Sequence, residues 1–158
     1  MNSPNFIKIL PFAFALHNIE EAWTICNAGT FEHNPFVVNN NQFIVAVTLF
    51  TILGFVLVFG KKLYRNQQCY EYAITGFAGM LFLNTFFPHI LSAIYFQTYT
   101  PGLITTSILI LPLTSIILWK IFRSRIFSNK QFTITILSSG IAGIILIAVF
   151  LGIGYILS

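Results

Sequence analysis

The stretch NQFIVAVTLFTILGFVLVFG, residues 41–60, decides the class of this protein because its twenty consecutive residues carry no charge. An α-helix rises about 1.5 Å per residue, so a hydrocarbon core of about 30 Å requires about 20 mostly apolar residues. The stretch has that length and composition. It is therefore predicted to cross a lipid bilayer as a helix.

Four further stretches have the same character, and together they predict an all-α, polytopic transmembrane helix bundle. Of the residues, 56% are hydrophobic and 8% are charged, whereas a soluble domain carries about 25% charged residues. We therefore expect one transmembrane domain over residues 1–158, multi-pass in the cell membrane. The expected spans cover about residues 4–26, 41–60, 70–97, 102–120 and 131–157.

The basic residues predict the orientation of the bundle. All of them fall near the N-terminus, between the second and third spans, or between the fourth and fifth: Lys8, Lys61, Lys62, Arg65, Lys120, Arg123, Arg125 and Lys130. Cytoplasmic loops carry an excess of such residues, so we expect a cytoplasmic N-terminus and an external C-terminus. Membrane orientation also accounts for the net charge of +4 without a nucleic-acid partner. On this topology Cys26 and Cys69 lie on opposite sides, which disfavours a disulfide between them.

Three ionisable residues, His17, Glu20 and Glu21, form an H-x-x-E-E pattern near the middle of the first expected span. An ionisable side chain at the bilayer centre costs about 3 kcal/mol on insertion scales, so such groups persist where they face the bundle interior and have partners. On a helix, residues three and four positions apart are neighbours, which places all three on one stripe. This stripe is the candidate functional site.

The third expected span supplies partners for this stripe, Asn84 and His89. On a straight helix their side chains would point about 140° apart, but Pro88 lacks an N–H and its ring crowds the carbonyl of Asn84. A kink there is predicted to turn both side chains toward the stripe, in a layer nearer the outer face. Glu32 and His33, in the external loop, either cap this layer or lie in a solvated loop.

Imidazole, carboxylate and amide groups are ligands suited to Zn, Fe or Mn. We expect a divalent transition metal bound by His17, His89 and at least one of Glu20 and Glu21. The other glutamate would act as a general base on a bound water, and Asn84 would stabilise an oxyanion, which makes Glu20, Glu21 and Asn84 the expected catalytic residues. The alternative is a buried hydrogen-bond network in which one glutamate stays protonated.

A further pattern, Tyr99-Thr100-Pro101-Gly102, places Pro and Gly at the positions that favour a type II turn. Together with the H-x-x-E-E pattern and the N-x-x-x-x-H pattern of residues 84–89, it makes the chain resemble the HXXEE family of small bacterial integral membrane proteins. That family is marked by these three motifs in this order. The resemblance implies that the motif residues are the family's marked positions, and it implies no activity, because the family's activity is unknown.

The fifth expected span carries no ionisable side chain and is predicted to be structural. Ser139 with Gly143, and Ala148 with Gly152, are small residues four positions apart, a spacing that lets helix backbones approach closely. We therefore expect this span to pack within the bundle or at a dimer interface.

These features predict a metal-dependent hydrolase acting on a lipid or a membrane-embedded peptide. A metal-ion or proton binding or transport protein is the first alternative, and an accessory subunit whose polar network only sets helix register is the second. The off-centre site, and a sequence without a visible inverted repeat, favour an enzyme over a transporter. The expected partners are the lipid bilayer and that substrate.

Overall fold

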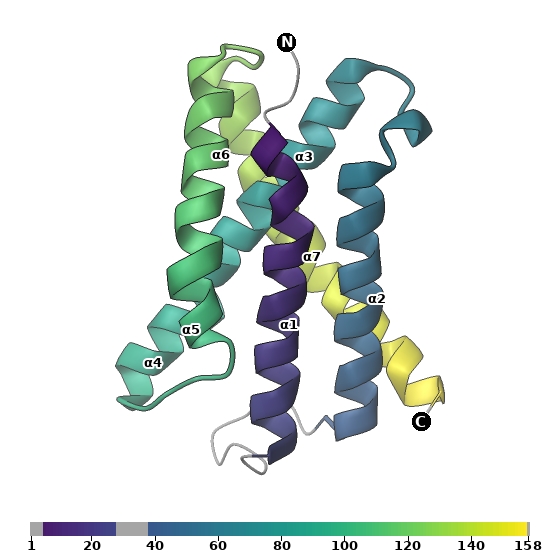
Figure 1. Cartoon of the computed structure of the whole chain (residues 1–158), viewed down its shortest axis with the longest axis vertical. Helices are drawn as coiled ribbons and strands as arrows, with labels where there is room; N and C mark the ends of the chain where they lie inside the picture. Colours follow the sequence, from purple (N-terminus) through teal and green to yellow (C-terminus); the bar gives the residue numbers. More distant parts are fainter. Residues whose placement is uncertain (1–4, 28–37, 158) are drawn as a thin grey trace.

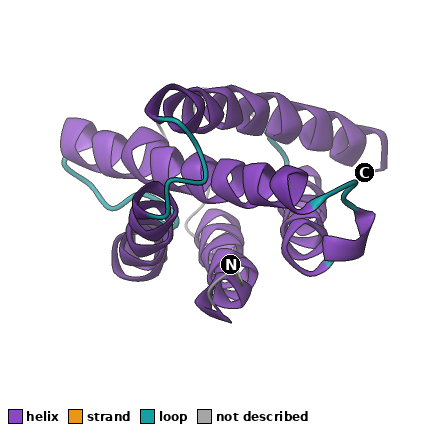
Figure 2. Cartoon of the chain, turned by 90° about the horizontal axis from the view of Figure 1, so that it is seen from above, coloured by secondary structure: helices purple, strands orange, loops and turns teal. Residues whose placement is uncertain are grey.

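The computed structural model describes residues 5–27 and 38–157, and over these residues the fold is all-α (Figure 2). A 3₁₀ segment, Asn5–Ile9, leads into α1, Leu10–Asn27, and α2 is Asn40–Phe59. The third segment consists of α3 (Gln67–Asn84), a π-helical stretch (Thr85–Ile90) and α4 (Leu91–Phe96). The fourth consists of α5 (Leu103–Thr105), a π-helical stretch (Thr106–Ile110) and α6 (Leu111–Arg123), and α7 is Asn129–Leu157.

Four of these helical segments are long and apolar enough to cross a membrane: Asn40–Phe59, Gln67–Phe96, Leu103–Arg123 and Asn129–Leu157. They indicate a membrane protein. The α1 helix is not among them, since its 18 residues include the polar side chains of the H-x-x-E-E pattern. Each expected span nevertheless has a helical counterpart, and the crossing of the membrane by α1 stays a prediction.

The helices form two layers. In Figure 1, α1, α2 and α6 stand nearly upright, while α3 with α4, and α7, run obliquely behind them; Figure 2 shows the same crossing from above. The α7 helix packs on α2 and α3, α1 packs on α2, and α6 packs on α3. The α1 helix starts at one end of the bundle, and α7 finishes at the other.

A core of aliphatic and aromatic side chains lies between α1, α3 and α6. Leu10 and Phe14 of α1, Ile74 and Phe77 of α3, and Ile117 of α6 are all buried. The ring of Phe14 meets the ring of Phe77 edge-on, with 5.6 Å between their centroids, a favoured aromatic geometry. This packing turns one face of α1 toward the third and fourth segments, and that face carries the polar stripe.

Polar residues mark where the helices begin. Asn39 caps α2, its side-chain oxygen accepting a hydrogen bond of 3.0 Å from the N–H of Gln42, and Asn66 caps α3 in the same way. Ser128 and Gln131 form a reciprocal capping box before α7, with hydrogen bonds of 2.9 and 3.2 Å. These caps satisfy backbone N–H groups that have no partner within their helices.

The small residues predicted in the fifth span behave in two ways. Ser139 lies against Gly76 of α3, and a Cβ atom placed on the buried Gly143 would lie 2.7 Å from a methionine side chain of α3. This first pair therefore packs within the bundle, as predicted. The second pair, Ala148 and Gly152, is exposed, and no described atom lies within 4 Å of a Cβ placed on Gly152.

Candidate functional site

Three side chains from two helical segments converge near one end of the bundle: His17 and Glu21 of α1, and His89 of the third segment. Each offers a metal-ligand atom, and these atoms all lie within 4.8 Å of one another. The Oε1 atom of Glu21 is 3.8 Å from Nε2 of His17 and 3.5 Å from Nε2 of His89. The first and third segments therefore meet through the predicted residues.

The two histidines are buried and the glutamate forms the open edge of this group. His17 and His89 are each 2% exposed, and the side chain of Glu21 is 19% exposed. Buried polar groups require hydrogen-bond partners, and both imidazoles have them. For His89 the partner also determines which ring nitrogen carries a proton.

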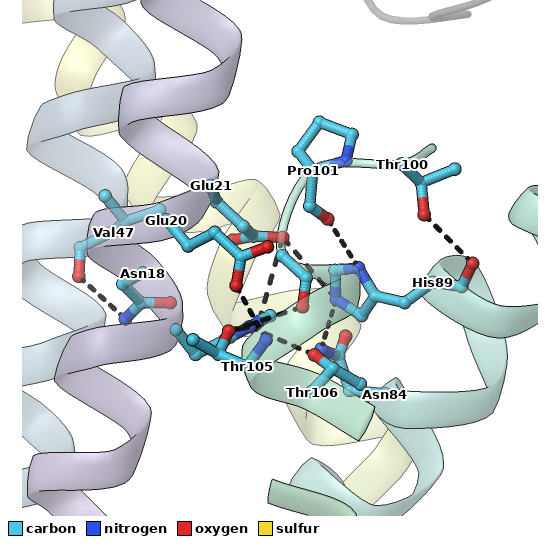
Figure 3. Close-up of polar contacts among 12 residues, drawn as sticks. Asn18, Glu20, Glu21, Val47, Asn84, His89, Thr100, Pro101, Thr105 and Thr106 are labelled. Atoms are coloured by element: carbon cyan, nitrogen blue, oxygen red, sulfur yellow. Dashed lines mark hydrogen bonds and ion pairs between the residues drawn. The ribbon is translucent and has the colours of Figure 1, made fainter. Parts of the chain in front are cut away.

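His89 is held by the turn that follows its helix, as Figure 3 shows. Its Nδ1 atom lies 2.8 Å from the carbonyl oxygen of Pro101, and because a carbonyl oxygen only accepts, Nδ1 carries the proton. In the neutral ring, Nε2 then has the lone pair, and it accepts a hydrogen bond of 3.0 Å from Nδ2 of Asn84. Metal-binding histidines commonly donate their other N–H to a backbone carbonyl in this way.

The break in the third segment explains why Asn84 reaches His89. Phe87 leaves the helical region, with φ −129° and ψ 119°, and Pro88 cannot donate a backbone hydrogen bond. The surrounding stretch is π-helical, with an i→i+5 pattern that brings residues five positions apart close together. The kink predicted at Pro88, and the convergence of the two side chains, are confirmed.

His17 is held by two hydroxyl groups of the fourth segment. Its Nδ1 atom lies 3.2 Å from Oγ1 of Thr105 and 3.0 Å from Oγ1 of Thr106. The Thr105 hydroxyl donates to the carbonyl oxygen of Gly102 at 3.3 Å, which leaves its lone pairs to accept a proton from Nδ1 of His17. In the tautomer that carries its proton on Nδ1, the Nε2 lone pair of His17 faces Glu21. Sequence reasoning missed both threonines, and a threonine in an apolar span carries no pattern that would single it out.

Glu20 lies outside the ligand group, in which Glu21 is the one glutamate beside the two histidines. Its Oε1 atom accepts hydrogen bonds from the Tyr99 hydroxyl and from the N–H of Ile104 at 3.1 Å, and its Oε2 atom accepts from the N–H of Thr105 at 2.7 Å. Both carboxylate oxygens are thus engaged at the start of the fourth segment, where backbone N–H groups have no helical partner. Figure 3 shows Glu20 reaching Thr105.

Gly102 brings the backbone of the turn directly against the site. Its φ of +77° and ψ of −1° match the third position of a type II turn, as predicted, and Leu103 closes the turn with a hydrogen bond to the carbonyl of Thr100. A Cβ atom at Gly102 would lie 2.5 Å from Cε1 of His17 and 2.8 Å from Cγ of Glu21. Both the space and the left-handed conformation therefore require glycine.

A polar residue of α1 that lies between the site residues points away from the ligand group. Asn18, inside the H-x-x-E-E pattern, points to α2 and donates to Oγ1 of Thr51 at 2.6 Å and to the carbonyl of Val47 at 3.4 Å, which ties α1 to α2. Glu32 and His33, predicted as a possible cap, lie outside the described residues.

Comparisons with known proteins agree with the sequence motifs. Residues 8–117 match a family model described as "Protein of unknown function with HXXEE motif". The chain is also 31% identical over 144 residues to the uncharacterized protein YrkK of Bacillus subtilis (strain 168), a match that covers 90% of this chain and 89% of that protein. No solved structure matches the chain.

Proposed function

The chain belongs to the HXXEE family, a family of unknown function, and we propose that it binds a divalent transition-metal ion through His17, Glu21 and His89. The convergence of three ligand atoms within 4.8 Å carries the proposal. Two imidazole nitrogens and a carboxylate oxygen suit Zn, Fe or Mn. Tetrahedral ligands about 2.1 Å from an ion lie about 3.4 Å apart, and the 3.5 and 3.8 Å separations around Glu21 are close to that value.

The hydrogen bonds of both imidazoles support this ligand set. The carbonyl oxygen of Pro101 keeps the proton of His89 on Nδ1, and the hydroxyls of Thr105 and Thr106 can accept a hydrogen bond from Nδ1 of His17. With both rings protonated at Nδ1, each Nε2 lone pair is directed toward Glu21. Asn84 is the competitor, since its amide donates to the Nε2 lone pair of His89. A metal ion at that nitrogen requires the amide of Asn84 to turn away. The amide N–H is then free to donate a hydrogen bond to an oxygen on which negative charge develops beside the site.

We further propose that the site hydrolyses a bond in a lipid or a membrane-embedded peptide. Three protein ligands that leave one position open are typical of catalytic zinc sites. An ion bound there would act as a Lewis acid and would lower the pKa of a bound water molecule. The exposed edge at Glu21 gives the substrate its approach, whereas the three hydrogen bonds to Glu20 argue against that residue as the base.

A second candidate function is the binding or transport of the ion without bond chemistry. The burial of His17 and His89, each 2% exposed, favours it, because a small ion reaches them more readily than a bulky substrate does. The two functions separate in proteoliposomes. A hydrolase cleaves a fluorogenic lipid ester or a membrane-embedded peptide when loaded with metal, whereas a transporter accumulates Zn²⁺ in the vesicle and cleaves neither.

The metal content of protein purified without chelator tests the shared step. We expect about one ion per chain in the wild type, and its loss in folded His17→Ala, Glu21→Gln and His89→Ala variants. Glu71→Gln is the matched control, because Glu71 is also a buried acid but lies in the first turns of α3, at the other end of the bundle (Figure 1). Circular dichroism and size-exclusion profiles in detergent verify folding. Equal metal content in the control and the three site variants would refute the proposal.

A further inference from the structure

The two adjacent glutamates of the motif have different partners, and we infer that Glu20 is a positioning residue. In this inference Glu20 fixes residues 99–106 against α1, and that segment in turn holds both metal-binding imidazoles in the orientation that binds the ion. The inference deepens the proposed function and rests on it.

The first step is the attachment of the fourth segment to α1. Glu20 accepts hydrogen bonds from the backbone N–H groups of Ile104 and Thr105, at 3.1 and 2.7 Å. These N–H groups lie at the start of a helical segment, where the backbone dipoles favour a negative charge. One side chain of α1 therefore replaces the capping residue that the fourth segment lacks, since Gly102 in the N-cap position has no side chain.

The second step links this attachment to His17. The N–H of Thr105 is bound by Glu20, and the hydroxyl of the same residue lies 3.2 Å from Nδ1 of His17. Thr106, the next residue, places its hydroxyl 3.0 Å from the same nitrogen. A shift of this backbone moves both hydroxyls, and the hydrogen bond at one ring nitrogen sets the tautomer and orientation that the other nitrogen presents.

The third step links the attachment to His89. The Tyr99 hydroxyl donates to Glu20, and Pro101, two residues later, accepts the Nδ1 proton of His89 at 2.8 Å. Burial, followed by the hydrogen bond to Glu20, raises the pKa of Tyr99, so this hydroxyl keeps its proton and remains a donor. Glu20 thus binds residues 99–106 at Tyr99 and at the Ile104 and Thr105 N–H groups. This segment contacts both imidazoles.

The isosteric pair Glu20→Gln and Glu21→Gln separates a positioning residue from a ligand. Glutamine at position 20 keeps one oxygen that can accept from the backbone N–H groups. Glutamine at position 21 removes the carboxylate of Glu21, whose Oε1 atom lies 3.8 Å from Nε2 of His17 and 3.5 Å from Nε2 of His89. The same change at neighbouring positions therefore has different consequences under the inference and equal consequences if both glutamates bind the ion.

The experiment is a Co²⁺ titration of the full-length protein in detergent, followed by visible absorption and metal analysis. We expect Glu20→Ala to weaken Co²⁺ binding by about 10- to 100-fold, the usual effect of losing a partner that orients a ligand, and to shift the absorption of the saturated protein. Glu20→Gln should recover most of the affinity and bind one Co²⁺ per chain. Tyr99→Phe should weaken Co²⁺ binding and shift the absorption as Glu20→Ala does, but by a smaller amount. Glu21→Gln should not reach one bound Co²⁺ per chain.

Two results would overturn this inference alone. One is a folded Glu20→Gln protein that loses Co²⁺ as completely as Glu21→Gln, because Glu20 would then be a ligand. The other is a Glu20→Ala protein with the affinity and spectrum of the wild type, because Glu20 would then position nothing. A wild-type protein that binds neither Co²⁺ nor Zn²⁺ would overturn the proposed function and this inference together.

Discussion

Gly102 shows how closely single residues constrain the site without taking part in its chemistry. Its α-carbon lies over His17 and Glu21, and its φ of +77° falls in the region that L side chains avoid. The left-handed conformation costs a residue with a side chain about 1–2 kcal/mol. The closeness of the His17 ring adds a steric cost, since a Cβ atom would lie 2.5 Å from Cε1.

We predict that Gly102→Ala weakens metal binding by at least about tenfold and lowers the thermal unfolding midpoint. The added methyl group must push the turn away from His17 and Glu21 or leave the backbone strained. Co²⁺ titration and thermal melts in detergent measure the two effects. Gly152→Ala is the control, since a Cβ there meets no described atom within 4 Å. A Gly102→Ala protein with wild-type affinity and stability would contradict the geometry of the turn.

The two threonines beside His17 lead to a second prediction at this scale. Either hydroxyl can serve Nδ1 of His17, at 3.2 Å for Thr105 and 3.0 Å for Thr106. We predict that Thr105→Val and Thr106→Val each weaken metal binding by less than about tenfold. The double variant should lose more than the sum of the two, because a buried nitrogen without a partner costs about 1–3 kcal/mol. Strictly additive losses in a double-mutant cycle would argue that the hydroxyls act independently.

The sequence singled out side chains that converge at the candidate site but only some of their partners. His17, Glu21, Asn84 and His89 could be singled out because polar groups are rare and costly in such spans. Glu20 was grouped with them by chemistry and helical position, yet its actual partners are backbone N–H groups of a segment more than eighty residues away. Spacing within one helix carries no information about which unpaired N–H groups another segment brings nearby.

At the scale of helices, hydrophobic length located the segments and proline located one of the two irregular stretches. Pro88 predicted the break in the third segment. The π-helical stretch Thr106–Ile110 was not predicted, although Pro112, two residues after it, cannot donate a hydrogen bond to the carbonyl of Ile108 within it. That stretch carries Thr106, whose hydroxyl faces His17. The stretch also packs on α1, a tertiary contact that no local pattern records.

The packing of α3 on α7 gives a prediction at this scale. Gly79 of α3 lies against Ile136 of α7, and a Cβ atom there would lie 2.9 Å from Cγ1 and 3.2 Å from Cα of Ile136. We predict that Gly79→Ala lowers the stability of the bundle by about 1–3 kcal/mol, the usual cost of overpacking. Gly152→Ala adds the same methyl group to a helix without crowding. Unfolding in detergent should therefore show a lower stability for Gly79→Ala than for Gly152→Ala. Equal stability of the two variants would show that the α3–α7 interface shifts to accommodate the methyl group.

At the scale of the whole molecule, basic residues and the candidate site lie at opposite ends of the bundle. The ammonium group of Lys120, late in α6, lies 4.1 Å from the ring centroid of Phe6, so the start of the chain and the end of α6 share one end. The basic turn Lys61–Leu63 joins α2 to α3 at that same end (Figure 1). The turn from α4 to α5, which covers the site, lies at the other end. Lys120 and the segment Lys61–Leu63 therefore lie at the end of the bundle opposite the site, and the orientation in the membrane stays a prediction.

That polarity makes the orientation in the membrane a testable prediction. The basic end should face the cytoplasm, because lysine and arginine are retained on that side, and the site should then open to the external side. Cys69, at the start of α3, and Cys26, near the end of α1, lie at opposite ends of the bundle and are both free thiols. They report on the two sides without a disulfide between them.

We predict that a membrane-impermeant maleimide labels Cys26 in intact cells and labels Cys69 only after the cells are permeabilised. The variants Cys69→Ser and Cys26→Ser isolate each thiol. Because Cys26 is half-buried, Asn27→Cys, at an exposed position in a cysteine-free background, provides an accessible probe on the same side. Labelling of Cys69 in intact cells, with protection of position 27, would invert the topology. The proposed metal site would then face the cytoplasm, and a substrate of the proposed hydrolase would have to reach it from that side.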